Sequence, residues 1–156
     1  MNSSRDFNYK IQRECARQWR MVVASITHEI STSARDGNFH ELGLRVGIRY
    51  ATLAALPPCS SLKELEEAIS ARWKIMDWGW TNLDEQGKNL LIVHHNAGNG
   101  SLHASGFGEQ TRAWAPAFLC GAYQQWLASL GAGDKLRVSQ VSDMDELGTI
   151  EFQLGL

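Results

Sequence analysis

Three of the five histidines lie close together in the chain, where they could form part of a metal site. Neutral imidazole is a common metal ligand, and His94 and His103 could converge if the chain folds back between them. Adjacent residues on a strand point to opposite faces, so His94 and His95 cannot both serve one site in regular geometry. No nearby Cys or Asp completes a coordination shell. We therefore expect no metal and no other cofactor.

Paired carboxylates near tryptophans suggest a second chemistry, glycoside hydrolysis. The candidates form two groups, which are Asp77, Asp84 and Glu85 near Trp78 and Trp80, and Asp143, Asp145 and Glu146 near the C-terminus. Most of these acids also fit turns, and Asp77 fits the end of a helix. The tryptophans could stack on sugar rings or pack in a core. A small carbohydrate-active enzyme or sugar-binding domain that uses carboxylates near Trp78 and Trp80 therefore stays open as the alternative hypothesis.

Other catalytic motifs fail on spacing. His28-Glu29 begins an HExxH motif, but Thr32 stands where the second histidine is required. A glycine-rich loop is expected over residues 96–110, without the strand–glycine–helix spacing of a dinucleotide site or the Lys-Ser/Thr pair of a P-loop. We expect no catalytic residue.

Composition places the chain among folded single domains. It has 156 residues, of which 44% are hydrophobic and 21% charged. The 15 basic and 17 acidic residues give a net charge of −2, so no basic excess is present to bind nucleic acid. Three widely spaced cysteines do not suit a disulfide framework. The N-terminal segment lacks the apolar region of a signal peptide, which predicts a cytoplasmic protein.

A helix followed by a hairpin is predicted over residues 76–95. Trp78 and Trp80 alternate with smaller residues and are expected on one face of a strand. Residues 84–88 are expected to form a turn with Gly87 at positive φ. The apolar run Leu90–Val93 predicts a strand with both faces covered.

Helical periodicity predicts the other elements. One apolar stripe spans residues 7–30, which is longer than a small domain requires and indicates a partner. A second helix over 38–53 contains a GxxxG pair, Gly43 and Gly47, which predicts the close approach of another backbone.

A third helix opens with the capping box Ser61 and Glu64 and ends near residue 76, and its outer face is expected to be solvated. That face carries Lys63, Glu66, Glu67 and Lys74. A fourth helix is predicted with Pro116 in its first turn and tryptophans on its buried side.

Two short strands, over 136–141 and 149–154, are expected to complete the fold. This order predicts an α+β fold with about four helices and an antiparallel sheet of about four strands. We expect a single domain over 1–156 that forms oligomers, with a flexible segment at 1–6.

Several motifs together resemble the D-subunit family of bacterial cellulose synthase. They are W-G at Trp78–Gly79, L-I-V-H at Leu91–His94 and Y-x-x-W-L at Tyr123–Leu127. The similarity extends over Leu62–Val93 and Trp114–Ala132, and in pattern over most of the chain.

The resemblance implies a non-catalytic accessory protein of cellulose synthesis. Members of the family are expected to form a cylindrical homo-octamer built from dimers, with internal passageways for glucan chains. The implied partners are subunits of the cellulose synthase complex and a proline-rich accessory protein of the same operon. Export of glucan makes the periplasm the alternative location.

The resemblance also implies that the N-terminal segment faces the inside of the ring. In this sequence the implied glucan-passageway residues are Asn2, Ser3, Ser4, Arg5 and Phe7.

Overall fold

The computed structural model describes residues 38–97 and 111–156, with side chains described at 40–97 and 114–156. Three helices and four strands occupy these ranges. In chain order they are α3 (Asn38–Leu53), α4 (Leu62–Ile75), β1 (Trp80–Gln86), β2 (Asn89–His95), α6 (Thr111–Ser129), β3 (Arg137–Gln140) and β4 (Ile150–Gly155). The predicted α+β class is confirmed. The helix expected over 7–30 lies outside the described residues.

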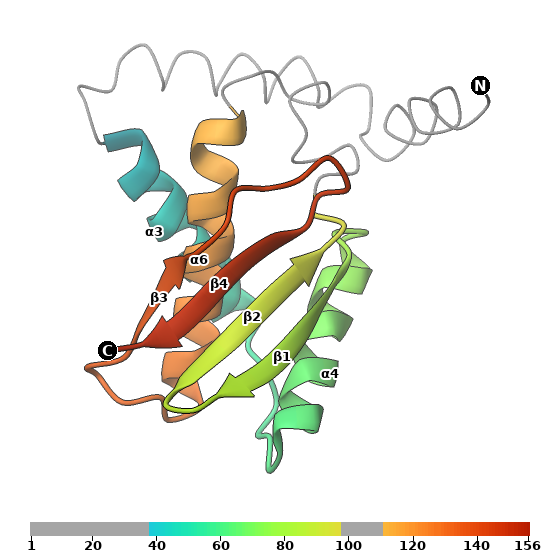
Figure 1. The fold of residues 1–156 in the computed structure, drawn as a ribbon, viewed down its shortest axis with the longest axis vertical. Coiled ribbons are helices and arrows are strands. Elements are labelled where there is room, and N and C mark those ends of the chain that lie inside the picture. The colour runs from blue at the N-terminus through green and yellow to red at the C-terminus, as the bar shows by residue number, and fades with distance from the viewer. Residues whose placement is uncertain (1–37, 98–110) are drawn as a thin grey trace, which may run out of the picture.

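The four strands form one antiparallel sheet in the order β1-β2-β4-β3. Helices α4 and α6 lie behind this sheet, and α3 packs against α6 on the side away from the strands (Figure 1). The described elements therefore form layers, with α6 between a helix and a sheet. That position explains why α6 is largely apolar, with eight buried apolar side chains from Ala115 to Leu127.

Alternation along the strands determines which side chains enter the core. On β4, Ile150, Phe152 and Leu154 are buried, while the residues between them are half-buried. The same alternation on β1 and β2 buries Thr81, Leu83, Ile92 and His94. On β2 it leaves Leu91 and Val93 half-buried, so the expectation that both faces of this strand are covered is wrong for the part of the chain described.

Glycines permit the close crossing of α3 and α6. A Cβ on Gly47 would overlap the carbonyl of Phe118, and one on Gly121 would overlap the carbonyl of Leu44. Gly43 likewise faces the backbone of α6 at Trp114. The close approach predicted from the GxxxG pair is confirmed, and its partner is α6.

Trp73 occupies the centre of the core and is fully buried. Its ring contacts six other aromatic rings, those of Tyr50, Trp78, His94, Phe118, Tyr123 and Trp126. Burial of Trp73 and Trp126 confirms the core role expected from their spacing on helices. Trp19 lies outside the described residues.

Two local predictions hold at the ends of elements. Ser61 Oγ accepts a hydrogen bond from the Glu64 backbone N–H at 3.1 Å, so α4 begins with the predicted cap. The Glu64 carboxylate accepts from the Ser60 N–H at 2.7 Å, one residue earlier than a standard capping box. Gly87 has a φ of 64°, as expected for the hairpin turn.

Other predictions about this region are wrong. The expected turn over 84–88 is shorter, because β1 continues to Gln86 and β2 begins at Asn89. Pro116 lies inside α6, which begins at Thr111, and not in its first turn.

The tryptophan pair is also separated. Trp78 precedes β1, and positive φ at Asp77 (55°) and Gly79 (77°) reverses the chain on either side of it. Trp78 therefore packs on Trp73 and Phe118 in the core. Trp80 lies on the strand with 43% of its surface exposed. The two do not share a strand face.

Candidate functional site

A buried polar cluster lies where α4, α6, β1 and β2 meet. The Tyr123 hydroxyl lies 2.6 Å from His94 Nδ1, 2.6 Å from Thr81 Oγ1 and 3.2 Å from Trp73 Nε1. The other nitrogen of His94, Nε2, lies 2.7 Å from the Trp78 carbonyl oxygen. All four of the side chains are fully or almost fully buried.

Donor and acceptor roles in this cluster follow from its fixed members. A carbonyl oxygen only accepts, so His94 Nε2 carries the proton that is donated to Trp78. The neutral ring then accepts at Nδ1 from the Tyr123 hydroxyl. The Tyr123 oxygen in turn accepts from Trp73 Nε1–H and from the Thr81 hydroxyl. Every polar side-chain atom in the cluster is satisfied, which is the condition for burying such groups at little cost.

Burial controls the ionisation of the same groups. The pKa of His94 falls to about 4, mainly because burial disfavours the charged ring. The hydrogen bond to Trp78 partly opposes this shift, and the neighbouring His95 adds to it. Burial also raises the pKa of Tyr123, against the effect of its hydrogen bonds to Thr81 and Trp73. Near neutral pH both side chains are uncharged. With its donors and acceptors already paired, the cluster serves to fix four elements in place.

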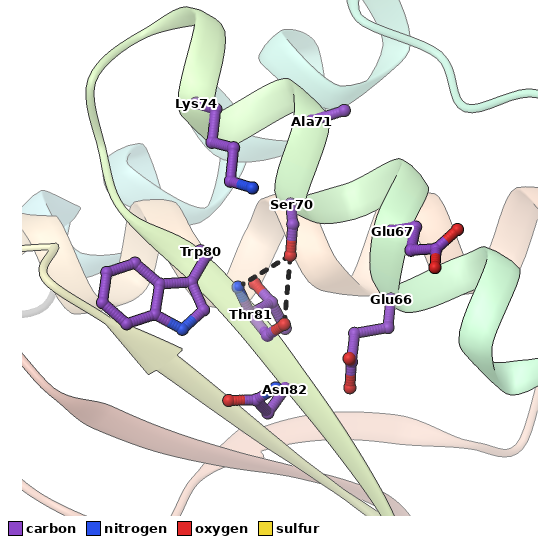
Figure 2. Close-up of a pocket in the computed structure, with 8 residues that line it drawn as sticks. All are labelled: Glu66, Glu67, Ser70, Ala71, Lys74, Trp80, Thr81 and Asn82. Carbon is purple, nitrogen blue, oxygen red and sulfur yellow. Dashed lines mark hydrogen bonds between the residues drawn. The ribbon is translucent and has the colours of Figure 1, made fainter.

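A groove of about 310 Å³ lies beside this cluster, between α4 and β1 (Figure 2). Its walls are Glu66, Glu67, Ser70, Ala71 and Lys74 from the helix, and Trp80, Thr81 and Asn82 from the strand. The Trp80 indole stacks on the His95 ring, with 5.2 Å between ring centroids and 20° between planes. An exposed aromatic ring and several polar groups therefore border one hollow.

Side chains of α4 hold β1 in place along this groove. Ser70 Oγ donates to the Thr81 carbonyl and accepts from the Thr81 N–H, both at 3.0 Å. Glu66 Oε2 accepts from the Leu83 N–H at 2.7 Å. β1 is an edge strand, so these bonds satisfy backbone groups that have no strand partner.

Helix side chains also bind the backbone of β3, the strand at the opposite edge of the sheet. On β3, the Val138 N–H donates to Gln124 Oε1 at 2.8 Å, and the Val138 carbonyl accepts from Cys120 Sγ at 3.2 Å. Gln124 Nε2 also donates to the Leu136 carbonyl, at 3.3 Å. Burial raises the pKa of the Cys120 thiol to about 11, which keeps it protonated and able to donate.

The structure separates the three histidines named from the sequence. His94 is buried within the cluster, and His95 points to the other face of the sheet, where it stacks on Trp80. The opposite orientation expected for these neighbours is confirmed. His103 lies outside the described residues. Within the described ranges, no group of three or more His, Cys, Asp or Glu side chains is arranged to hold a metal ion.

The carboxylate candidates lie in three places, which are the end of α4, the strand β1 and the turn before β4, and two of them have hydrogen-bond partners. Asp77 adopts positive φ two residues after the end of α4. Asp84 lies four residues along β1 from Trp80, about 13 Å at strand spacing. Asp145 Oδ1 accepts from the backbone of Leu147 and Thr149, which closes the turn before β4. The remaining candidates, Glu85, Asp143 and Glu146, are exposed.

Sequence reasoning named Trp80 but missed the α4 side chains that join the two walls of the groove, Glu66 and Ser70. Glu66 was expected on a solvated face, but it is half-buried and bound to Leu83. The available signal was the spacing of Glu66 and Ser70, which places two hydrogen-bonding side chains on one side of the helix. The implied passageway residues, Asn2, Ser3, Ser4, Arg5 and Phe7, lie outside the described residues.

The architecture defines a small α+β domain with helices on one face of a four-stranded antiparallel sheet. It is similar to a solved structure of trafficking protein particle complex subunit 3 from Naegleria fowleri, covalently bound to palmitic acid. The TM-score is 0.55 at 16% identity, over 89% of this chain and 93% of that chain. At this identity the similarity concerns the fold alone.

The sequence as a whole matches a known family. The pattern of the cellulose synthase D-subunit family matches residues 5–155, so the chain belongs to this family. Membership supports a role in cellulose synthesis and association with the cellulose synthase complex. No curated protein matches the sequence significantly.

The lengths and polarity of the helices bear on membrane insertion. Within the residues that the structure describes, no helix combines the length and apolar character needed to cross a bilayer.

Proposed function

We propose that this chain is a non-catalytic accessory subunit of bacterial cellulose synthesis. It assembles with copies of itself into a ring or cylinder, which organises synthase complexes and guides glucan chains for export as crystalline cellulose. The observation that carries the proposal is the family match over residues 5–155. A homo-octamer built from dimers is the proposed form, with the synthase subunits and a proline-rich accessory protein as partners.

The described structure supports a binding role over a catalytic one. The buried polar cluster that resembles an active site in composition has every hydrogen-bonding atom occupied and is closed to solvent. Asp84 and Glu85 are neighbours on β1, and Asp143, Asp145 and Glu146 share the turn before β4. None of the carboxylates considered for glycoside hydrolysis lines the groove.

Exposed apolar side chains support assembly. Val46, Ile48 and Leu53 of α3 expose 45%, 38% and 79% of their surface in the single chain. Large apolar side chains left in water favour association when a partner can cover them. Because helix side chains already bind backbone groups of Thr81 and Leu83 on one edge strand and of Val138 on the other, we propose that contacts between copies use helix surfaces.

The test is the native mass of the full-length protein, measured by light scattering after size-exclusion chromatography. The chain mass is 17.4 kDa, and the proposal requires a discrete particle several times larger. A monomer at micromolar concentration contradicts it. A second experiment deletes the gene for this protein in a cellulose-producing cell. We expect the cell to make cellulose of lower yield or crystallinity.

A further inference from the structure

The groove between α4 and β1 combines features of a ligand site that its structural role does not require. Fixing β1 needs only Ser70 and Glu66, yet the hollow extends along α4 from Glu66 to Lys74, roughly 12 Å at 1.5 Å per residue. At about 310 Å³ it is at the lower end of small-molecule sites, which measure about 300–1,000 Å³. It accommodates a short stretch of a longer molecule.

The walls of the groove are held in place before any ligand binds. The two hydrogen bonds of Ser70 to Thr81 and the bond of Glu66 to Leu83 join the helix wall to the strand wall. His95 stacks on one face of the Trp80 indole, which fixes the orientation of this ring, and 43% of the surface of Trp80 is exposed. Preformed walls reduce the ordering cost of binding.

Several polar groups in the groove are available to a ligand. Figure 2 shows Lys74 extending from α4 toward the space near Trp80, with Asn82 on the other side of the indole. Neither side chain has a hydrogen bond or ion pair with another described residue. Glu66 uses one carboxylate oxygen on Leu83 and retains the second. The hollow therefore presents donors, acceptors and one aromatic ring.

The charges in the groove exclude most ligand classes. Glu66 and Glu67 oppose phosphates and other anions, while Lys74 opposes cations. No three-ligand metal group occurs among the described residues. A neutral molecule with many hydroxyl groups and a flat apolar face satisfies the mixture of donors, acceptors and aromatic surface. A pyranose ring has this form, because its axial C–H bonds make an apolar face and its hydroxyls lie around the rim.

We propose that the groove binds a short segment of β-1,4-linked glucan. Trp80 stacks on the face of one glucose ring, while Lys74, Asn82 and the free oxygen of Glu66 bind its hydroxyls. The choice of glucan rests on the proposed function in cellulose synthesis, and it adds a contact site on the folded domain, apart from the N-terminal residues. Each copy of the chain then carries one such site, and several copies act together on a single glucan.

The test uses full-length protein and the soluble oligomer cellohexaose, with binding followed by saturation-transfer NMR on the sugar protons. Wild-type protein is expected to transfer saturation to the ring protons of the sugar. The Trp80→Ala variant is expected to raise Kd about tenfold or more, since stacking on an aromatic ring contributes about this factor. Trp80→Phe, which keeps a flat ring, is expected to retain most of the affinity.

The matched control is Ile75→Ala on the same helix, since Ile75 is 76% exposed and lies outside the groove. It should bind as wild type does. The affinity should change little between low and high salt, because the sugar is neutral. Maltohexaose, which has α-1,4 links and a different chain shape, should bind much more weakly.

Three results would overturn the proposal. They are no saturation transfer from wild-type protein, unchanged affinity in Trp80→Ala, or equal affinity for maltohexaose. Native mass and circular dichroism of each variant establish that it is folded and assembled. If the protein assembles but does not bind cellohexaose, only the proposed glucan site is contradicted. If it is a monomer that binds cellohexaose through Trp80, the proposed ring is contradicted and the proposed glucan site stands.

Discussion

At the scale of single residues, the Tyr123 hydroxyl joins three buried polar side chains, those of Trp73, Thr81 and His94. Replacing Tyr123 with Phe leaves His94 Nδ1 without a donor, and leaves Trp73 Nε1 and Thr81 Oγ1 without an acceptor. Each unsatisfied buried group costs about 1–3 kcal/mol. We expect Tyr123→Phe to lower the free energy of unfolding by about 3 kcal/mol or more, measured by urea denaturation.

Tyr50 offers a matched control, because its ring also stacks on Trp73, with 5.5 Å between the ring centroids. Its hydroxyl has no hydrogen bond to another described residue. Tyr50→Phe removes the same atom and should change stability by less than about 0.5 kcal/mol. Similar losses in the two variants would show that the hydroxyl network contributes no more than ring packing does.

The ionisation of His94 makes stability depend on pH. Its pKa falls from the ordinary 6.5 to about 4 in the folded protein, mainly because burial disfavours the charged ring. Between these values the unfolded chain binds the proton and the folded chain does not. The contribution of neutral His94 to the free energy of unfolding is therefore intact above pH 6.5 and is lost as the pH falls toward 4. The loss should total about 3 kcal/mol.

Urea denaturation at a series of pH values measures this dependence. The His94→Gln variant is the comparison, since it keeps a hydrogen-bonding side chain but cannot titrate in this range. Subtracting its curve from that of the wild type isolates the histidine. Identical slopes for the two proteins between pH 4 and pH 6.5 would contradict the assignment.

At the scale of elements, the crossing of α3 and α6 depends on glycines that touch the opposite backbone. A methyl group on Gly47 would overlap the Phe118 carbonyl, which belongs to a packed helix and cannot move aside easily. We expect Gly47→Ala to cost about 3 kcal/mol or more. Gly133→Ala makes the same chemical change where nothing lies within 4 Å, and should be nearly neutral in thermal unfolding.

Patterns that act within a few residues were readable in the sequence, and those that depend on tertiary contacts were not. The Ser61 cap and the Gly87 turn follow from local chemistry. The GxxxG pair predicted a close approach at Gly47 but not its partner, α6. The separation of Trp78 from Trp80 was missed, because it depends on positive φ at Asp77, a residue without the permissive backbone of glycine.

The candidate site was harder to predict for a similar reason. Glu66 on an exposed-looking helix face is indistinguishable in sequence from a solvated acid until β1 is placed beside it. The same holds for Gln124, whose partner Val138 comes fourteen residues later on β3. Such contacts require the topology of the sheet, which depends on the whole chain.

At the scale of the whole molecule, the proposed assembly links stability to protein concentration. If copies associate only when folded, dilution favours the unfolded state by mass action. We expect the midpoint of thermal unfolding to rise with concentration, measured by scanning calorimetry over about a hundredfold range. A constant midpoint would indicate that assembly contributes nothing to folding, or does not occur in that range.

The hydrogen-bonded edges of the sheet have a consequence for growth. A protein whose edge strands have unpaired backbone groups can add copies without limit, as fibrils do, because every added strand creates a new edge for the next. Here Ser70 and Glu66 occupy one edge and Gln124 and Cys120 the other. Strand addition is therefore opposed at these positions, so we expect copies to meet through other surfaces and each copy to keep its own four-stranded sheet.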